Sequence, residues 1–164
     1  MAVTYPEARL IEGELTLRDM QLTKDVRMTK PSLIRWLALA MGLISPNESR
    51  NSVLAVFDAL LYFQLGERRD PDIHELLEYN RRLHRNVGDK CVRYHLLQLK
   101  NMGLIERKKG RYRFVTSPLS EKGDIIGTID YVFKRRADLS ISKIKEAMRE
   151  LQESYRSGAG AELV

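Results

Sequence analysis

The chain has 164 residues, of which 43% are apolar, and its 28 Lys and Arg side chains outnumber 22 Asp and Glu. A chain of this length forms one domain, with or without extensions, and buries about two-thirds of its unfolded surface. The apolar content excludes a disordered chain, and a single cysteine excludes an internal disulfide. The amino end lacks a basic flank before an apolar core, and the longest apolar stretch, 33–44, is too short to span a bilayer. We therefore expect a soluble, basic, cytoplasmic protein without membrane contact.

The basic residues concentrate in one window of the sequence. Residues 81–113 hold eleven Lys and Arg side chains but only two acidic ones, Asp89 and Glu106. Because the whole chain carries a net charge of +6, the other residues together are net acidic. A basic excess confined to one segment is typical of a surface that binds a polyanion, and a solvated charged face is the alternative.

The first part of the chain predicts short strands and then helices. Residues 8–18 alternate weakly between apolar and polar types, which favours one or two strands. A helix is predicted from Thr29, and the run 33–44 is apolar nearly all round, so this helix must be buried on most of its faces. The segment 45–48, Ser-Pro-Asn-Glu, resembles a capping box that opens the next helix, which ends near Gly66.

The middle of the chain predicts two further helices and a hairpin. Asp70-Pro71 is predicted to cap the first of them, and Gly88-Asp89 begins the second, which ends at Gly103. Two β-prone runs, 104–107 and 111–115, flank a turn at Lys109-Gly110 and predict a short hairpin.

Two more helices are predicted after Pro118. The first covers about 119–136 and turns one apolar face inward, and Ser140 or Ser142 caps the second. The second carries apolar residues at 3, 4, 3, 4 spacing, a seam about two heptads long. The inward face comprises Ile125, Ile126, Ile129, Val132 and Phe133, and the seam comprises Ile141, Ile144, Met148, Leu151 and Tyr155.

Three helices followed by a hairpin, within residues 46–115, follow the order of a winged helix-turn-helix. The run GDKCVRYHLLQLKNMGLIERKKGRYRF, residues 88–114, resembles the recognition helix and wing of winged-helix transcription regulators of the ArsR and MarR kind. The resemblance covers roughly residues 50–115 and implies a winged helix-turn-helix with a small β-hairpin wing. With the helices predicted before and after this region, the expected fold is mainly α, with extra N- and C-terminal helices. It implies duplex DNA as the partner but not which sequence is bound. Its matching residues are Val92, Leu96, Leu99, Gly103, Leu104, Ile105 and Tyr112.

The resemblance places Lys90, Arg93 and Tyr94 where members of this family contact DNA. Arg93 has the fork that pairs with a guanine edge, and Gln98 has the amide that pairs with adenine. Leu97 has two interpretations, contact with a thymine methyl group or cover for the core. On the wing, three basic residues are expected to contact phosphate or enter the minor groove: Lys108, Lys109 and Arg111. At the end of the second helix of the motif, three arginines are expected to contact phosphate: Arg81, Arg82 and Arg85.

No motif indicates catalysis, a cofactor or a metal. The sequence has no glycine loop that cradles phosphate, no nucleophile elbow and no paired-cysteine metal box. Cys91 is interpreted as a small core residue, and the pair His74 and Glu78 has too few neighbours to bind a metal. We expect no enzymatic activity and no cofactor. The rival function is a winged-helix module for protein contacts, whose basic face meets an acidic partner, and RNA ranks below duplex DNA.

These observations predict a homodimeric DNA-binding transcriptional regulator. Two recognition helices related by a twofold axis read half-sites about 34 Å apart. The dimer is inferred from the apolar run and the seam described above, and a monomer that buries both internally is the alternative. Four segments are expected: an N-terminal extension (1–45), the DNA-binding domain (46–117), C-terminal helices for dimerisation (118–156) and a flexible tail (157–164).

Overall fold

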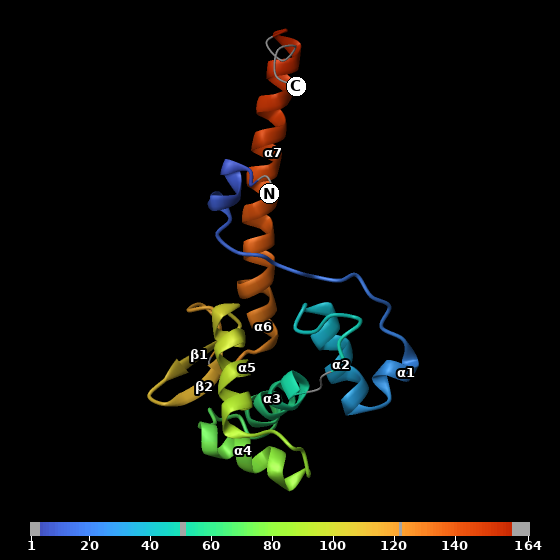
Figure 1. Ribbon diagram of the computed structural model, residues 1–164, viewed down its shortest axis with the longest axis vertical. Helices are drawn as coiled ribbons and strands as arrows, with labels where there is room; N and C mark the ends of the chain where they lie inside the picture. Colours follow the sequence, from blue (N-terminus) through green and yellow to red (C-terminus); the bar gives the residue numbers. More distant parts are fainter. Residues whose placement is uncertain (1–3, 50–51, 122, 159–164) are drawn as a thin grey trace. The chain divides into compact units, whose positions relative to one another are not determined.

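Helices make up most of the described chain, and one hairpin of two antiparallel strands accompanies them (Figure 1). The computed structural model describes residues 4–49, 52–121 and 123–158. The chain divides into two compact units, Met1–Phe114 and Val115–Val164. Within the described ranges, no helix is long and apolar enough to cross a membrane. Most of the predicted tail, 157–164, lies outside the described residues.

The segment before the first long helix is mostly irregular. Its regular elements are a single 3-10 turn, η1 (Pro6–Leu10), and a four-residue helix, α1 (Lys24–Arg27). The prediction of strands within 8–18 is therefore wrong. A strand is stabilised by pairing and by burial of one face, and the side chains of this segment stay mostly exposed.

Helix α2 (Lys30–Ala40) begins as predicted but ends before the apolar run does. Thr29 caps its start, because the threonine hydroxyl oxygen accepts a hydrogen bond from a backbone amide of the first turn at 3.3 Å. At the other end Gly42 adopts a φ of +72°, which takes the chain out of the helix. Arg18 reinforces this end by donating from Nη1 to the Leu39 carbonyl oxygen at 2.5 Å.

Helix α3 (Ser52–Leu61) continues directly into a π-helical turn, η2 (Tyr62–Gly66), so the predicted end at Gly66 is confirmed. The predicted start at Ser45 is wrong. The Ser45 amide donates to a Glu48 carboxylate oxygen at 3.1 Å, as in a capping box, but this bond closes a local turn. Serine and glutamate side chains satisfy backbone groups in turns as well as at helix starts, which is why the motif misleads.

Helix α4 (Ile73–Arg82) is capped two residues later than predicted. Asp72 accepts a hydrogen bond from the Glu75 amide at 2.9 Å, and Glu75 accepts one from the Asp72 amide at 2.8 Å. This reciprocal pair is a capping box, and it satisfies two amides that the first turn leaves free. The spacing of Asp72 and Glu75 is visible in the sequence and is a stronger helix-start signal than Asp70-Pro71. The prediction of Asp70 as the cap overlooked it.

Helix α5 (Asp89–Asn101) confirms the prediction at both ends and on its buried face. Gly88 is the N-cap residue, and Gly103, with a φ of +77°, follows the carboxyl end. The predicted inward residues are the three that are buried: Val92, Leu96 and Leu99.

Strands β1 (Ile105–Lys108) and β2 (Arg111–Phe114) form the predicted hairpin. Lys109-Gly110 connects them with φ values of 51° and 77°, the two positive values that a tight two-residue hairpin turn requires. The Tyr112 amide donates to the Pro71 carbonyl oxygen at 2.8 Å. This bond ties the hairpin to the segment that precedes α4.

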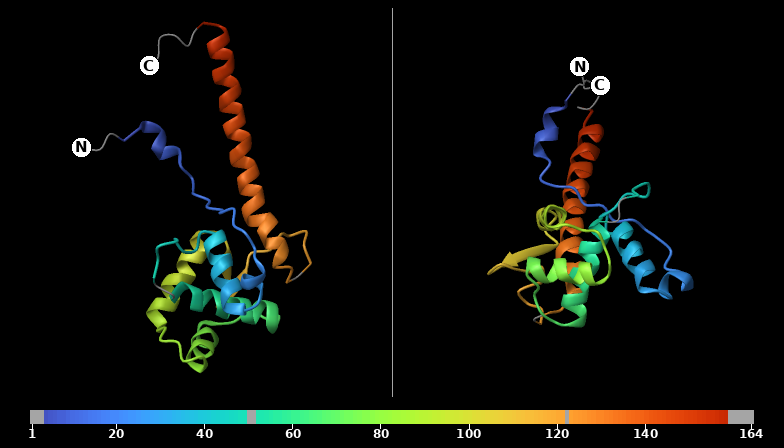
Figure 2. Two further views of the ribbon diagram at one scale, coloured as in Figure 1. Left: turned by 90° about the vertical axis from the view of Figure 1, so that its right-hand side faces the viewer. Right: turned by 60° about the horizontal axis from the view of Figure 1, so that its bottom comes forward.

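The core of the first unit lies among α3, α4, α5 and the hairpin (Figures 1 and 2). Phe57 of α3 and Phe114 of β2 meet edge to face, with ring centroids 6.3 Å apart. Helix α2 packs against α3 and adds Ile34 and Ala38 to the buried set. The most deeply buried aliphatic side chains are Val56, Leu60, Leu76, Val92, Leu96, Leu99 and Leu104.

The second unit contains one unbroken helical stretch where two helices were predicted (Figure 2). Helix α6 (Ile126–Thr128), the π-helical segment η3 (Ile129–Lys134) and helix α7 (Arg135–Arg156) follow one another without a break. The prediction that Ser140 or Ser142 caps a new helix is wrong, because no glycine or proline occurs between residues 128 and 156 and both serines are exposed within α7.

The apolar face predicted for the first of those two helices is only partly buried. Val132 and Phe133 are buried, whereas Ile126 and Ile129 are exposed and Ile125 is half-buried. Among the described residues, α7 itself has no buried side chain. Burial in this unit is therefore concentrated in η3 and does not extend along the long helix.

Candidate nucleic-acid interface

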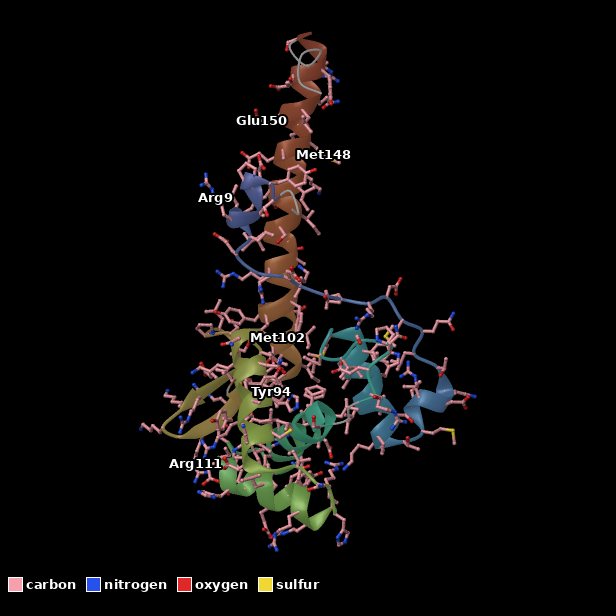
Figure 3. All side chains as sticks on the ribbon, viewed as in Figure 1. Arg9, Tyr94, Met102, Arg111, Met148 and Glu150 are labelled. Carbon is pink, nitrogen blue, oxygen red and sulfur yellow. The ribbon has the colours of Figure 1, made fainter. Side chains whose placement is uncertain are left out.

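The outward face of α5 is exposed because the opposite face packs in the core, and the exposed face contains basic side chains. A helix advances about 100° per residue, so the three buried positions leave a broad opposite face. That face contains four of the predicted contact residues together with Leu97, all exposed. Figure 3 shows the side chain of Tyr94 on this helix. The four predicted residues are Lys90, Arg93, Tyr94 and Gln98.

Arg93 is paired with an acid on its own helix. Its Nε lies 2.7 Å from Asp89 Oδ2, one turn earlier, and the hydrogen bond to this carboxylate raises the pKa of the guanidinium further. Both side chains are about half exposed, so the pair contributes little to stability. A phosphate group, or a base edge that accepts two hydrogen bonds, competes with Asp89 for the same guanidinium.

Tyr94 and Gln98 form a second pair on this face. Gln98 donates from Nε2 to the Tyr94 hydroxyl oxygen at 2.8 Å, across one helical turn. His95 lies beside them, 3.3 Å from the Gln98 amide oxygen through Nδ1 and 2.8 Å from the Ser52 hydroxyl through Nε2. These contacts link the middle of α5 to the start of α3.

The tip of the hairpin carries cations that have no acidic partner in the described part of the chain. Lys108 and Lys109 are both exposed and lie within 4.0 Å of no carboxylate among those residues, and the same holds for Lys90 on α5. At the base of the hairpin, Arg113 pairs with Glu106 across the two strands at 2.6 Å. Within the hairpin, the lysines without an acidic partner therefore lie at its tip.

Arg111 has a bracing role in the hairpin. Its Nη1 donates to the Asp70 carbonyl oxygen at 2.8 Å and lies 3.2 Å from Glu75, the third residue of α4 and a member of its capping box. The side chain is about half exposed, so part of the guanidinium still faces solvent. Partial burial raises the pKa of the Glu75 carboxyl, but the hydrogen bonds from the Asp72 amide and from Arg69, which contacts the same carboxylate, outweigh burial and lower this pKa.

Arg81 and Arg82 are exposed at the carboxyl end of α4. Both contact Glu78, at 2.7 Å and 3.2 Å respectively, and Arg81 is the larger cause of the lowered pKa of that carboxyl. One acid shared by two highly exposed arginines leaves a net positive charge at this helix end. Their position therefore remains compatible with contact to phosphate.

Arg85 differs from the other predicted contact residues because it faces a buried acid. Its Nη2 lies 2.7 Å from Oδ2 of Asp58, which is only 3% exposed on α3, and its Nη1 donates to the Asn80 side chain at 3.2 Å. An unpaired carboxylate at that depth is costly, so Arg85 is held by the core. We therefore leave Arg85 out of the interface.

Tyr79 completes this buried network. Its hydroxyl donates to Oδ2 of Asp58 at 3.2 Å, and burial, followed by the negative charge of Asp58, raises the pKa of Tyr79 to about 12. Sequence reasoning missed Asp58, although a signal was present. A single acid within the apolar run VLAVFDALLYF, on the inward side of a helix, indicates a buried partner cation.

The arrangement brings a basic helix face and a basic hairpin tip together in one compact unit. In the described residues no group of three or more His, Cys, Asp or Glu side chains is placed to hold a metal ion. Cys91 is a half-buried free thiol on α5. No protein-family model, curated protein or solved structure matches the chain significantly.

We predict that Arg85→Ala lowers the free energy of unfolding by about 2–3 kcal/mol, because the substitution leaves Asp58 buried without its cation. Urea denaturation followed by circular dichroism measures this loss. Arg82→Ala, which removes an exposed arginine from the neighbouring helix, is the matched control and should change stability by less than about 0.5 kcal/mol. Equal, small effects of the two substitutions would show that the Asp58 pair has no structural role.

Proposed function

We propose that residues 52–114 form a winged helix-turn-helix module that binds duplex DNA and that the protein is a transcriptional regulator. In this proposal α5 enters the major groove, whose width of about 12 Å admits a helix, and the β1–β2 hairpin contacts the adjacent backbone or minor groove. The order of α3, α4, α5 and hairpin supports the proposal, as does the bond that holds the hairpin beside α4.

The observation that carries the proposal is the position of three exposed lysines. Lys90, Lys108 and Lys109 are exposed and have no acidic partner in the described ranges, and they lie on the two elements that a winged helix presents to DNA. Lysines without an acidic partner are available to neutralise phosphates, and this neutralisation releases the counterions condensed on DNA. Arg93 and Gln98 add donors and acceptors suited to base edges.

The direct test is fluorescence anisotropy of a labelled mixed-sequence duplex, titrated with the full chain over a series of salt concentrations. Four to six phosphate contacts predict a slope of log K against log salt of about −4 to −5. The double variant Lys108→Ala, Lys109→Ala should weaken binding to all duplexes alike and make this slope shallower by about 2. The control Lys24→Ala, Lys30→Ala removes the same charge from α1 and α2, where both lysines are exposed, and should leave the slope unchanged.

Binding that is absent even at low salt would overturn this function. A control that flattens the slope as much as the hairpin variant would show that DNA meets some other surface. In either case the rival hypothesis, a protein-contact module with an acidic partner, would take its place.

The proposal includes a homodimer formed through α7. The five seam residues lie on one face of the helix at heptad spacing, and each is 48–70% exposed within the single chain. Positions flanking the seam are mainly uncharged, namely Ser140, Ala147, Gln152 and Ser154, with Lys145 as the exception. A second copy of the helix therefore meets a wide strip of apolar and small residues.

Charge favours a parallel pair. In a parallel heptad arrangement Lys145 faces Ser140 of the second copy, and Ala147 faces Gln152, so no like charges meet. An antiparallel pair with full overlap brings the two copies of Lys145 together at its centre, which is unfavourable. By heptad position Glu146, Glu150 and Glu153 lie outside the seam. Figure 3 labels Glu150 and the seam residue Met148 on this helix.

Ile144→Lys should convert the dimer to a monomer, measured by light scattering coupled to size-exclusion chromatography, because it places two facing lysines within the apolar seam. Ser142→Lys adds the same charge on the outer side of the helix and should leave the dimer intact. In a Cys91→Ser background, a cysteine at Ile141 or at Tyr155 should form an interchain disulfide in the parallel pair. A wild-type chain that is monomeric at micromolar concentration would contradict the dimer without bearing on DNA binding.

A further inference from the structure

Leu97 lies exposed near the centre of the basic face of α5. It is 55% exposed, and at about 100° per residue it falls roughly 20° from Lys90 and 40° from Arg93 around the helix axis. A single exposed leucine is ordinary on a protein surface, so exposure alone indicates nothing. The position of Leu97 is informative, because this apolar side chain is surrounded by the residues that are best suited to contact DNA.

The packing of α5 excludes a core role for Leu97. The helix contacts α3, α4 and β1, and the three side chains buried in this core lie on its opposite side: Val92, Leu96 and Leu99. Of the two interpretations that the sequence leaves open for Leu97, cover for the core is therefore excluded. Tyr94, 56% exposed and held by Gln98 through its hydroxyl, adds a second apolar surface beside it.

A leucine side chain has neither hydrogen-bond donor nor acceptor, which limits what it can recognise in a groove. Most of the major-groove edge of a base pair consists of donors and acceptors, and a buried one that stays unpaired weakens binding. The apolar group that this edge offers is the C5-methyl group of thymine. Contact between this methyl group and Leu97 removes apolar surface of both from water.

We propose that Leu97 is a specificity-determining residue that selects thymine through its methyl group. This inference rests on the proposed function, because it requires α5 to lie in the major groove. In this proposal the preferred site contains a thymine, and Lys90 and Arg93 contact the phosphates or bases next to it. It also assigns a preference for DNA over RNA at this position, since uracil lacks the methyl group.

The test first enriches preferred duplexes from a randomised library with the full chain. Each thymine of the selected site is then replaced singly by deoxyuridine, which removes the methyl group and retains every hydrogen-bonding group. At one thymine in each half-site we expect wild-type binding to weaken by about fourfold, the ratio that burial of one methyl group supports. Leu97→Ala should bind the thymine and deoxyuridine duplexes equally at that position.

A matched control separates this effect from general loss of affinity. Lys100→Ala removes a neighbouring exposed side chain of α5 and should weaken both duplexes alike, so the ratio between them persists. Circular dichroism melting checks that Leu97→Ala remains folded, as expected for an exposed position.

The outcomes separate the two proposals. If wild-type protein binds a selected site yet tolerates deoxyuridine at every position, the role of Leu97 is disproved and DNA binding stands. A persisting thymine preference in Leu97→Ala would likewise disprove it. If no duplex is bound or enriched, both proposals fail, and the exposed leucine within a basic face would instead fit an acidic protein partner with an apolar pocket.

Discussion

The packing of α5 against α3 and α4 is the constraint on which the rest of the first unit depends. Val92, Leu96 and Leu99 are almost completely buried, and this burial fixes which side of the helix faces outward. Any rotation of α5 about its axis would expose these side chains and bury Lys90 or Arg93. The identity of the outward face, and hence the chemistry that it can perform, follows from this hydrophobic contact.

A second constraint positions the hairpin. The Tyr112 amide bonds to the Pro71 carbonyl oxygen, and Arg111 bridges to Glu75 in the first turn of α4, so β2 is held in place up to the turn at Lys109-Gly110. The basic tip and the basic helix face are thereby carried by one core. The buried pair of Asp58 and Arg85 contributes stability to that core and withdraws one arginine from the surface.

Sequence reasoning succeeds where local chemistry decides the structure and fails where tertiary context does. The faces of α5 and the turn at Lys109-Gly110 follow from periodicity and from the need for positive φ, and both are confirmed. The strands at 8–18 were wrong because pairing partners are not local, and the break near Ser140 was wrong because serine in a helix interior is only mildly unfavourable. From the sequence alone Arg85 is predicted to be a surface cation, because its buried partner, Asp58, lies far away in the sequence, on α3.

The measurement that tests the central claim most directly is an NMR titration of ¹⁵N-labelled protein with a short duplex, in which backbone amide shifts report the contact surface. The account predicts that the largest changes occur in α5 and across residues 105–114, with α7 and residues 4–22 nearly unaffected. Changes confined to α7 or to the amino-terminal segment would contradict it. So would a spectrum that an excess of duplex at low salt leaves unchanged.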